Sequence, residues 1–590
     1  MSKKKISLFR YRHALPQILL YQLISKAILG IGLYFFGQLT GLLLWSLDRP
    51  AFTSGDLPYL MRSWQGWLLL VCGFIALLIY TVFDIHATIL LADRLLKGMP
   101  VKALTLLKDA FAAVPRLKGR WGVLAVLYVS LITPLTLGGL NISLTSDLTV
   151  PDFIMSVIQS KTPLLIAYTA GMTVLGLLGL AYIFTFHFVL LEKYPIREAM
   201  RASFRLMKKH WPGFLARYAL FILKAAAFLT LIILLCYGVP AVVIHLLDLT
   251  GYFYQACIIF ITLITAAALG IWGLMFLYLS MMKLTLLFRE YNGQEAGAGA
   301  AFKKHRAVMG AIATTALLFL LVFSLGAATE FDLIFPAQSA VDVIAHRGGG
   351  TLANENTVLS LEAAIAHHAA GSEIDVQRTA DGAYIINHDS DFRRCCGDPR
   401  TPGEMTLEEI RQLKVVNASD PDAPAVPVAT IEEMLDAAKG RIHLYIELKG
   451  SSADDQMAED LYQMVLDREM LNECTFICLS YGVLERLEAA HPDARTGYLC
   501  YFSFGEIEKM SVDVLLLEAE TATAANISRI HAAGKQAAVW TVNDMTAMTR
   551  FMCSEADAVI TDEVAQADQV RRLLAERPDE VRVLSVLLPE

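Results

Sequence analysis

Three acidic residues in the second half of the chain have the types and spacing of a metal site. Glu373 and Asp375 lie two positions apart in a short β-prone run, so their side chains point to one face of a strand. Glu447 ends a second such run, two residues before Lys449. Carboxylates that are buried together repel each other unless a cation compensates them, and an all-oxygen ligand set favours Ca²⁺ or Mg²⁺ over zinc or copper. Salt bridges with Arg347 and Lys449 in a metal-free site are the alternative.

Two histidines are expected beside these carboxylates. His346 directly follows one β-prone run, and His388 follows the run 384–387. If Asp381 and Gly382 are the two turn residues of a hairpin, Asp375 faces His388, whereas a longer turn would shift this register. Because imidazole titrates near neutral pH, one histidine can take a proton from a nucleophile while the other gives one to a leaving group. Arg347, Lys449 and a metal would stabilise charge developing on a phosphoryl group.

The elements that must position these residues alternate between β-prone runs and helical segments. This alternation predicts a parallel sheet with crossover helices, and eight runs in about 230 residues match a (β/α)8 barrel. Such a barrel carries its active site at the C-terminal ends of the strands, where His346, Glu447 and Asp562 are found. The expected strands are 341–345, 373–376, 443–448, 475–479, 497–500, 512–517, 536–541 and 558–561.

Six motifs in this half resemble those of the glycerophosphodiester phosphodiesterase family. They occur in the family's order and cover essentially all of residues 341–565, a combination that is highly specific although each motif alone is weak. The motifs are His346-Arg347-Gly348, Glu355-Asn356-Thr357, Glu373-Ile374-Asp375-Val376, His388-Asp389, Glu447-Leu448-Lys449 and Trp540-Thr541-Val542-Asn543.

The resemblance implies a (β/α)8 TIM barrel with a small insertion within residues 392–440 and a divalent cation, Ca²⁺ or Mg²⁺. In the family mechanism the substrate's own glycerol hydroxyl attacks phosphorus, and water then opens the cyclic phosphate. Asn354, where proline is usual, and Leu479-Ser480-Tyr481, in place of Ser-Phe, depart from the family pattern without removing a chemical group. Glu355 is either a further ligand or a tie for the first loop, and we favour the tie. By motif match the metal ligands are Glu373, Asp375 and Glu447, the acid/base pair is His346 and His388, the phosphate contacts are Arg347 and Lys449, and Trp540 lines the substrate pocket.

The first half of the chain reads as a membrane domain. Residues of the set AVILMFWYC make up 55 % of all 590 residues and charged residues only 18 %, which excludes a disordered chain or an ordinary soluble protein. Apolar stretches of about 20 residues are long enough to cross a bilayer as helices. Asp84, His86 and His187 are polar residues of these stretches and mark either a pathway or pairing between helices. Seven stretches are expected to span, near 27–47, 67–91, 121–140, 163–191, 225–247, 256–282 and 309–328.

The distribution of Lys and Arg predicts the topology, because basic loops are retained in the cytoplasm. The N-terminus and the second, fourth and sixth connections hold 6, 7, 8 and 5 basic residues, whereas the first, third and fifth hold 2, 1 and 0. The N-terminus is therefore expected in the cytoplasm and the barrel outside. Residues 309–590 carry 21 basic and 45 acidic residues, a net charge of −24, which argues against nucleic acid as a partner.

Together these patterns predict a multi-pass cell-membrane protein whose extracytoplasmic barrel hydrolyses glycerophosphodiesters to an alcohol and glycerol phosphate. The expected partners are the lipid bilayer and a glycerophosphodiester, lysolipid or polyglycerol-phosphate substrate; the oligomeric state is left open. A phospholipase D- or C-like lipid hydrolase of the same fold is one alternative. A transporter or sensor whose barrel only binds glycerophosphodiesters is another. The expected domains are a membrane domain 1–328, a linker 329–340, the barrel 341–574 and a tail 575–590.

Overall fold

The chain forms two compact units in the computed structural model. One unit comprises Met1–Leu39 with Leu68–Glu330, and the other comprises Thr40–Trp67 with Phe331–Glu590. The second unit thus contains the barrel together with residues from the connection between the first two long helices. The expected domains instead place this connection in the membrane domain, 1–328. The structure describes residues 15–47, 50–53, 61–99, 103–128, 155, 158, 162–294, 306–335, 341–576 and 578–587.

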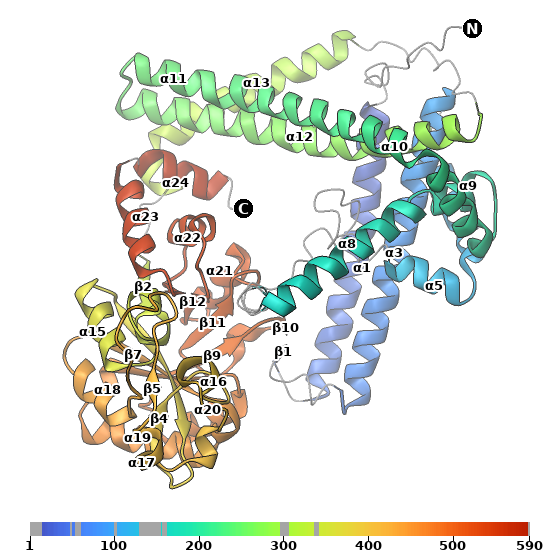
Figure 1. The fold of residues 1–590 in the computed structure, drawn as a ribbon. Helices are drawn as coiled ribbons and strands as arrows, with labels where there is room; N and C mark the ends of the chain where they lie inside the picture. The colour runs from blue at the N-terminus through green and yellow to red at the C-terminus, as the bar shows by residue number, and fades with distance from the viewer. Residues whose placement is uncertain are drawn as a thin grey trace. The chain divides into compact units, whose positions relative to one another are not determined.

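Long helices make up the described part of the N-terminal unit (Figure 1). A π-helical turn, Leu234–Gly238, joins two of them into one apolar segment, Ile196–Leu246. The helices are α1 (Leu15–Trp45), α3 (Trp64–Lys97), α4 (Ala103–Ala113), α5 (Arg120–Leu127), α8 (Thr162–Tyr182), α9 (Thr185–Leu191), α10 (Ile196–Ile233), α11 (Val239–Leu246), α12 (Gly251–Tyr291) and α13 (Arg306–Thr329).

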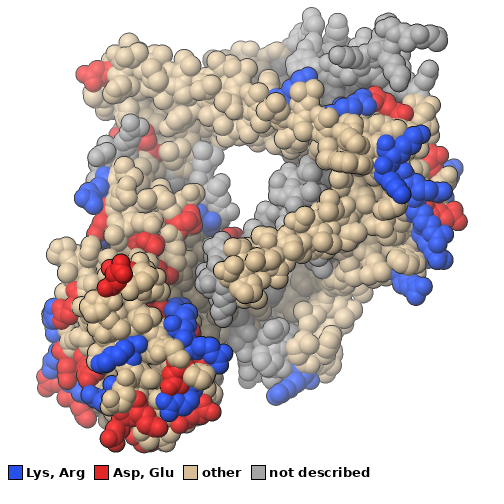
Figure 2. All heavy atoms as spheres, viewed as in Figure 1, with Lys and Arg blue, Asp and Glu red and all other residues tan. Residues whose placement is uncertain are grey.

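Four described helical segments are long and apolar enough to cross a membrane, and two more apolar helices are shorter. Their surface is mostly neither acidic nor basic on the face in Figure 2, as lipid contact requires. Six of the seven expected stretches coincide with described helices. The remaining stretch, 121–140, begins in α5, and its part after residue 128 lies outside the described residues. The long segments are Leu23–Trp45, Thr162–Leu191, Ile196–Leu246 and Gly251–Tyr291, and the shorter are Trp64–Ala76 and Ala313–Thr329.

Polar residues inside this unit pair with neighbouring helices. Asp84 accepts hydrogen bonds from the hydroxyls of Tyr21 and Ser25, at 3.3 and 3.2 Å. His187 Nε2 lies 3.1 Å from Thr285 Oγ1 of α12. These contacts favour pairing between helices over a polar pathway at these positions.

The C-terminal unit is a closed barrel of eight parallel strands, seen at the lower left of Figure 1. All eight expected strands are present, and the pairing of β2 with β3 closes the ring. In ring order the strands are β2 (Asp342–Ala345), β13 (Ala558–Thr561), β12 (Gln536–Trp540), β11 (Val514–Glu518), β9 (Thr496–Cys500), β8 (Cys474–Cys478), β7 (His443–Leu448) and β3 (Gly371–Arg378).

Two apolar layers hold the barrel together. Strand residues such as Ile344, Ile477 and Leu516 fill its interior, and a larger outer layer packs the strands against the helices. The strands read as continuous apolar runs because both of their faces are buried. Their crossover helices are α15 (Val358–Ala366), α18 (Ile431–Ala438), α19 (Asp455–Asp467), α20 (Tyr481–Ala490), α21 (Ala524–Ala532), α22 (Met545–Met552) and α23 (Val564–Glu576), followed by α24 (Pro578–Leu587) in the expected tail.

The hairpin after β3 forms, but its predicted register is wrong by one residue. Strand β4 (Tyr384–Ile386) pairs antiparallel with β3 so that Val376 faces Ile386, which aligns Asp375 with Asn387 instead of His388. The physical reason is a longer turn: residues 379–383 form it, and the Thr379 hydroxyl and amide both bond to Ala383.

The expected insertion follows this hairpin and has a small core of its own. Buried Phe392, Met405 and Ile410 pack there against Ile385 of β4. The insertion contains α16 (Arg393–Cys396), α17 (Leu407–Ile410) and the paired strands β5 (Lys414–Val415) and β6 (Val426–Pro427).

A separate two-stranded sheet in the second unit joins residues 450 positions apart. Strand β1 (Ala51–Thr53), which lies between α1 and α3, pairs antiparallel with β10 (Ser503–Gly505), which follows β9 of the barrel. No pattern in the sequence indicates this pairing.

Candidate active site

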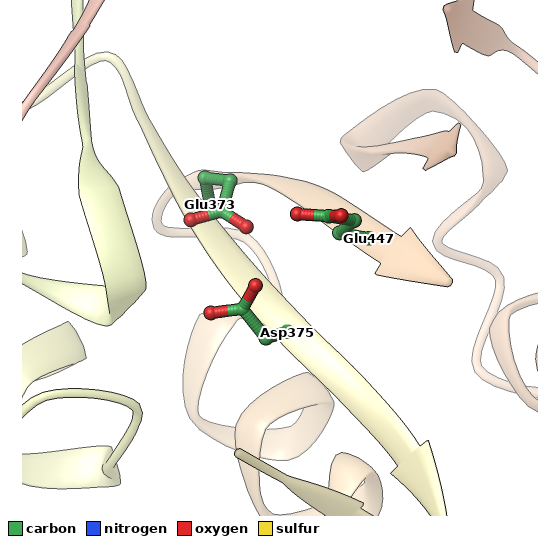
Figure 3. A group of neighbouring side chains, drawn as sticks. All are labelled: Glu373, Asp375 and Glu447. Carbon is green, nitrogen blue, oxygen red and sulfur yellow. The ribbon is translucent and has the colours of Figure 1, made fainter. Parts of the chain in front are cut away.

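The three predicted carboxylates meet at the C-terminal ends of β3 and β7. Glu373 and Asp375 share one face of β3, and Asp375 is in register with Glu447 on the neighbouring β7. One oxygen from each lies within 4.8 Å of the others, and all three residues are buried. Figure 3 shows the three side chains pointing toward one another.

Neighbouring groups satisfy some of the carboxylate oxygens. The Arg347 amide donates to Glu373 Oε2 at 2.9 Å, and the Asn356 side chain donates to Asp375 Oδ2 at 2.8 Å. Lys449 Nζ lies 2.8 Å from Asp375 Oδ1 and 2.9 Å from Glu447 Oε2. Buried Glu373 Oε1 accepts no hydrogen bond from any residue that the structure describes.

Burial and mutual repulsion dominate the electrostatics of this cluster. Burial, together with the charge of Asp375, raises the pKa of Glu373 to about 8. Burial also raises the pKa of Glu447. For Asp375, burial is outweighed by the charges of Lys449, His388 and Arg347, which hold its pKa well below the usual range. Three buried carboxylates lie within 4.8 Å of one another, and Lys449 is the only Lys or Arg side chain described as forming an ion pair with them, so a further cation fits the cluster.

The donor atoms indicate which cation. Glu373, Asp375 and Glu447 offer oxygen only, and Glu373 Oε1 is left without a partner among the described residues, as a ligand atom would be. Ca²⁺ and Mg²⁺ take such ligands. The cluster can therefore hold a divalent cation, and the metal-free arrangement of salt bridges is formed only in part, through Lys449.

Each of the two predicted histidines has a carboxylate on its Nδ1. His346, in the turn after β2, lies 2.8 Å from Asp562 Oδ1, and its Nε2 lies 3.8 Å from Glu373 Oε2. His388 Nδ1 lies 2.9 Å from Asp389 Oδ1. Such a bond fixes the orientation of an imidazole and leaves Nε2 to exchange protons.

The loop after β2 is held by ionic contacts with the insertion. Glu355 accepts two hydrogen bonds from Arg394 of α16, at 2.6 and 2.7 Å, and lies 3.5 Å from Arg347. Glu355 therefore ties the loop, which is the alternative favoured from the sequence. Arg347 adopts a left-handed φ of 50°, and its buried Nε has no hydrogen-bond partner among the described residues. Backbone strain of this kind persists at sites where the surroundings fix a functional group.

Trp540 is the last residue of β12, at the C-terminal end of that strand. Its indole donates to the Leu516 carbonyl at 2.9 Å, and its ring centroid lies 4.9 Å from that of Tyr501. Burial raises the pKa of Tyr501, and the charges of Lys449 and Glu447 also act on its hydroxyl. Tyr501 thus packs against Trp540 and is affected by the charges of the site.

A cleft of about 790 Å³ opens beside these groups. Three predicted site residues, His388, Glu447 and Lys449, line it. Hydroxyl side chains supply much of the remaining wall, which suits a hydrophilic substrate group: Ser390, Thr401, Ser451, Ser452 and Ser480.

The sequence motifs do not assign the residues that orient the histidines. Asp389 follows His388 directly, and Asp562 follows the last strand, so both could have been found by asking which carboxylates flank a histidine at a strand end. Asn356 is harder to find, because only the folded loop brings its amide onto Asp375.

Comparisons with known proteins match both halves of the chain. A model of the glycerophosphoryl diester phosphodiesterase family matches residues 346–566. A model of the membrane domain of glycerophosphoryl diester phosphodiesterase matches residues 4–326, more than half of the chain.

Similar proteins come from bacteria and animals. YhdW of Bacillus subtilis is 24 % identical over 227 residues, covering 37 % of this chain and 93 % of that protein. A glycerophosphodiester phosphodiesterase of Bacillus subtilis is 27 % identical over 29 % of this chain, and human glycerophosphodiester phosphodiesterase 1 is 26 % identical over 25 % of it. The chain spans 60 % and 44 % of the lengths of these last two relatives.

Solved structures also resemble the barrel. A glycerophosphodiester phosphodiesterase from Agrobacterium tumefaciens is 23 % identical, with a TM-score of 0.35, and covers 39 % of this chain and 99 % of its own. A phosphodiesterase from Oleispira antarctica, solved with the product sn-glycerol-3-phosphate, is 22 % identical, with a TM-score of 0.36. The match covers 39 % of this chain and 96 % of that protein.

Proposed function

Since the chain belongs to the glycerophosphoryl diester phosphodiesterase family and is a phosphoric diester hydrolase of that family, we propose that it cleaves glycerophosphodiesters at the cluster of Glu373, Asp375 and Glu447. The products are an alcohol and glycerol phosphate. One observation carries the assignment: two histidines, each oriented by a carboxylate on Nδ1, flank a buried carboxylate cluster at the barrel mouth.

In this proposal Glu373, Asp375 and Glu447 hold a divalent cation, Ca²⁺ or Mg²⁺. The cation supplies positive charge that polarises the phosphoryl group and stabilises developing negative charge. Lys449, 2.8 Å from Asp375, adds a fixed positive charge on the same side. Arg347 Nε, which has no hydrogen-bond partner among the described residues, donates to a phosphate oxygen in this proposal, while a terminal nitrogen of the same guanidinium stays near Glu355.

His346 and His388 form the proposed acid/base pair. Asp562 and Asp389 occupy the two Nδ1 atoms, so each ring exchanges its proton through Nε2. One ring removes a proton from the attacking glycerol hydroxyl, and the other gives a proton to the departing alcohol oxygen. Water then opens the cyclic phosphate and gives glycerol phosphate. Trp540 and Tyr501 provide an aromatic wall for the organic part of the substrate.

A barrel that only bound glycerophosphodiesters would not need two histidines held in this way, so the acid/base arrangement favours hydrolysis over a transport or sensing role. The substrates we propose are glycerophosphodiesters, including lysolipids and polyglycerol-phosphate polymers that are found at a membrane. The hydroxyl-rich wall of the cleft supports hydrophilic head groups.

We also propose that the protein is a multi-pass cell-membrane protein with about seven spans, a cytoplasmic N-terminus and an extracytoplasmic barrel. The match to the membrane-domain model and the four long apolar helices support the membrane location. The 26 basic residues in the N-terminus and the second, fourth and sixth connections, against 3 in the other connections, support the orientation.

The test is release of glycerol phosphate from glycerophosphocholine and related diesters by the purified full-length protein. His346→Ala and His388→Ala are each expected to reduce turnover by about 10²- to 10⁴-fold, the usual contribution of a general acid or base. His367→Ala, a histidine at the C-terminal end of α15, is the matched control and is expected to be fully active. Undiminished turnover in both site variants would contradict the assignment.

A further inference from the structure

The connection between α1 and α3 contributes a strand to the catalytic unit. In the β1–β10 sheet, Ala51 is in register with Gly505 and Thr53 with Ser503. The Glu506 amide also donates to the Pro50 carbonyl at 3.0 Å, which extends the pairing by one bond. The catalytic unit therefore includes a chain segment that precedes its partner strand β10 by about 450 residues.

Buried side chains hold this short strand in place. Ala51 is 3 % exposed and belongs to the outer apolar layer of the barrel. Thr53 is fully buried, and its Oγ1 lies 2.5 Å from the hydroxyl of Tyr498, a buried residue of β9. A pairing of three residues is marginal by itself, so these contacts anchor the strand.

Gly505 shows that the barrel is built for close approach by this strand. Its φ is +108°, a region that other residues rarely adopt. A Cβ atom at this position would lie 2.7 Å from the Pro50 carbonyl oxygen and 3.0 Å from Ala51 Cα. A side chain at Gly505 would thus push the two strands apart.

The paired segment lies next to the active site. Strand β10 follows the C-terminal end of β9, and strand C-terminal ends carry the site in this fold. Tyr501, two residues before β10, packs against Trp540, and the charges of Lys449 and Glu447 reach its hydroxyl. Whatever fixes residues 501–505 therefore also fixes the ring of Tyr501 against Trp540, at the C-terminal end of β12.

We propose that residues 51–53 are a positioning segment for the substrate pocket: β1 holds residues 501–505, and through Tyr501 it sets the aromatic wall at Trp540. This inference rests on the proposed function for its effect on substrate. It also requires the α1–α3 connection and the barrel to lie on one side of the membrane, so the chain crosses the bilayer an even number of times between them. The six expected stretches after the first satisfy this condition.

The pairing itself can be tested without measuring activity. In the full-length protein, the double variant Thr53→Cys/Ser503→Cys is expected to form a disulfide on mild oxidation, detected as a linked peptide by mass spectrometry, because opposed residues in antiparallel strands bring their Cβ atoms close. Thr53→Cys/Glu408→Cys, which joins the strand to exposed Glu408 of the insertion, is the control and should not cross-link. Equal or absent linkage in the two double variants would overturn the pairing.

The positioning role is tested by kinetics of matched glycine variants. Gly505→Ala is expected to raise KM about 5-fold or more while kcat changes little, since a displaced wall weakens binding without removing a reacting group. Gly534→Ala is the control, because Gly534 also has a positive φ, +74°, but has open space around it. Thr53→Val is expected to raise KM as Gly505→Ala does. Thr53→Ser, which keeps the hydroxyl, is expected to have the wild-type KM.

The outcomes separate the two proposals. Wild-type kinetics in Gly505→Ala and Thr53→Val would overturn the positioning role even if the strands cross-link. A wild-type protein that releases no glycerol phosphate, yet still forms the linked peptide, would contradict the proposed function and leave the strand pairing established.

Discussion

At the scale of single residues, a carboxylate outside the proposed metal cluster acts on one of the two histidines. Burial alone lowers the pKa of His346, but the Asp562 carboxylate outweighs burial, and the net shift is upward. The same bond holds the ring with Nε2 toward Glu373. Asp562 therefore sets both the orientation and the basicity of a proposed catalytic group.

The variant Asp562→Asn tests these two effects of Asp562, on the orientation and on the basicity of the His346 ring. Without the negative charge, burial dominates and the pKa of His346 falls, so the limb of the pH–rate profile that belongs to His346 moves to lower pH. Turnover is expected to fall by about 100-fold, the low end of a general acid–base contribution. The measurement is kcat/KM against pH for the full-length protein, with Asp568→Asn of α23 as a control. A lower rate with an unmoved profile would contradict the role.

The grouping of the carboxylates was predictable from the sequence because their types and order are local features. Glu373 and Asp375 share a strand face by simple alternation, and the structure places Glu447 beside them. The contact of Asp375 with His388 was predicted through a register that is wrong by one residue. Turn length decides this register, and a five-residue turn at 379–383 cannot be distinguished from a two-residue Asp-Gly turn by sequence alone.

At the scale of elements, the insertion supports the loop that carries His346 and Arg347. Arg394 of α16 bridges Glu355 of that loop and Asp389, the partner of His388. One side chain of the insertion thus links the surroundings of both histidines. Removing it leaves Glu355, which is largely buried, without its strongest hydrogen-bond donors.

Arg394→Ala is expected to loosen both loops and to lower turnover. Loss of a charged hydrogen-bond partner costs about 1 to 3 kcal/mol when the other group stays buried. Faster hydrogen exchange in the segments around 347–357 and 388–396, measured by mass spectrometry, would show the loosening. Arg393→Ala, which removes an exposed neighbour on the same helix, is the control. Unchanged exchange in Arg394→Ala would show that the bridge does not hold the loops.

The eight strands were predictable because a parallel barrel buries both faces of each strand, which leaves apolar runs at regular intervals. The β1–β10 pair was not predictable for the opposite reason. Its strands have three residues each, and nothing local in Ala51–Thr53 indicates a partner 450 residues away. Only the folded chain shows why Gly505 must lack a side chain.

At the scale of the whole molecule, charge and hydropathy divide the chain into a basic membrane half and an acidic catalytic half. Residues 1–308 carry 29 basic and 12 acidic residues, a net charge of +17, against −24 for the remainder. The apolar character of the helices was predictable from composition. Hydropathy predicts seven spans, whereas the described residues contain four long apolar segments and two shorter ones.

The proposed topology predicts which positions can be labelled from outside intact cells. In Glu408→Cys the new cysteine occupies an exposed position of α17, in the barrel. In Lys208→Cys it occupies an exposed position in the basic first part of α10. A membrane-impermeant maleimide should modify the first in intact cells and the second only after lysis, with the wild-type cysteines as background. Labelling of Lys208→Cys alone in intact cells would reverse the orientation.

We propose that a divalent cation held by Glu373, Asp375 and Glu447 enables hydrolysis, and removal of the metal is the most direct test. Glycerol phosphate release by the full-length protein should stop in EDTA and return with Ca²⁺ or Mg²⁺. Glu447→Gln should lose both turnover and binding of the metal ion measured by calorimetry, whereas Glu408→Gln should keep both. Full turnover in EDTA, with no metal bound to the wild-type protein, would contradict the account.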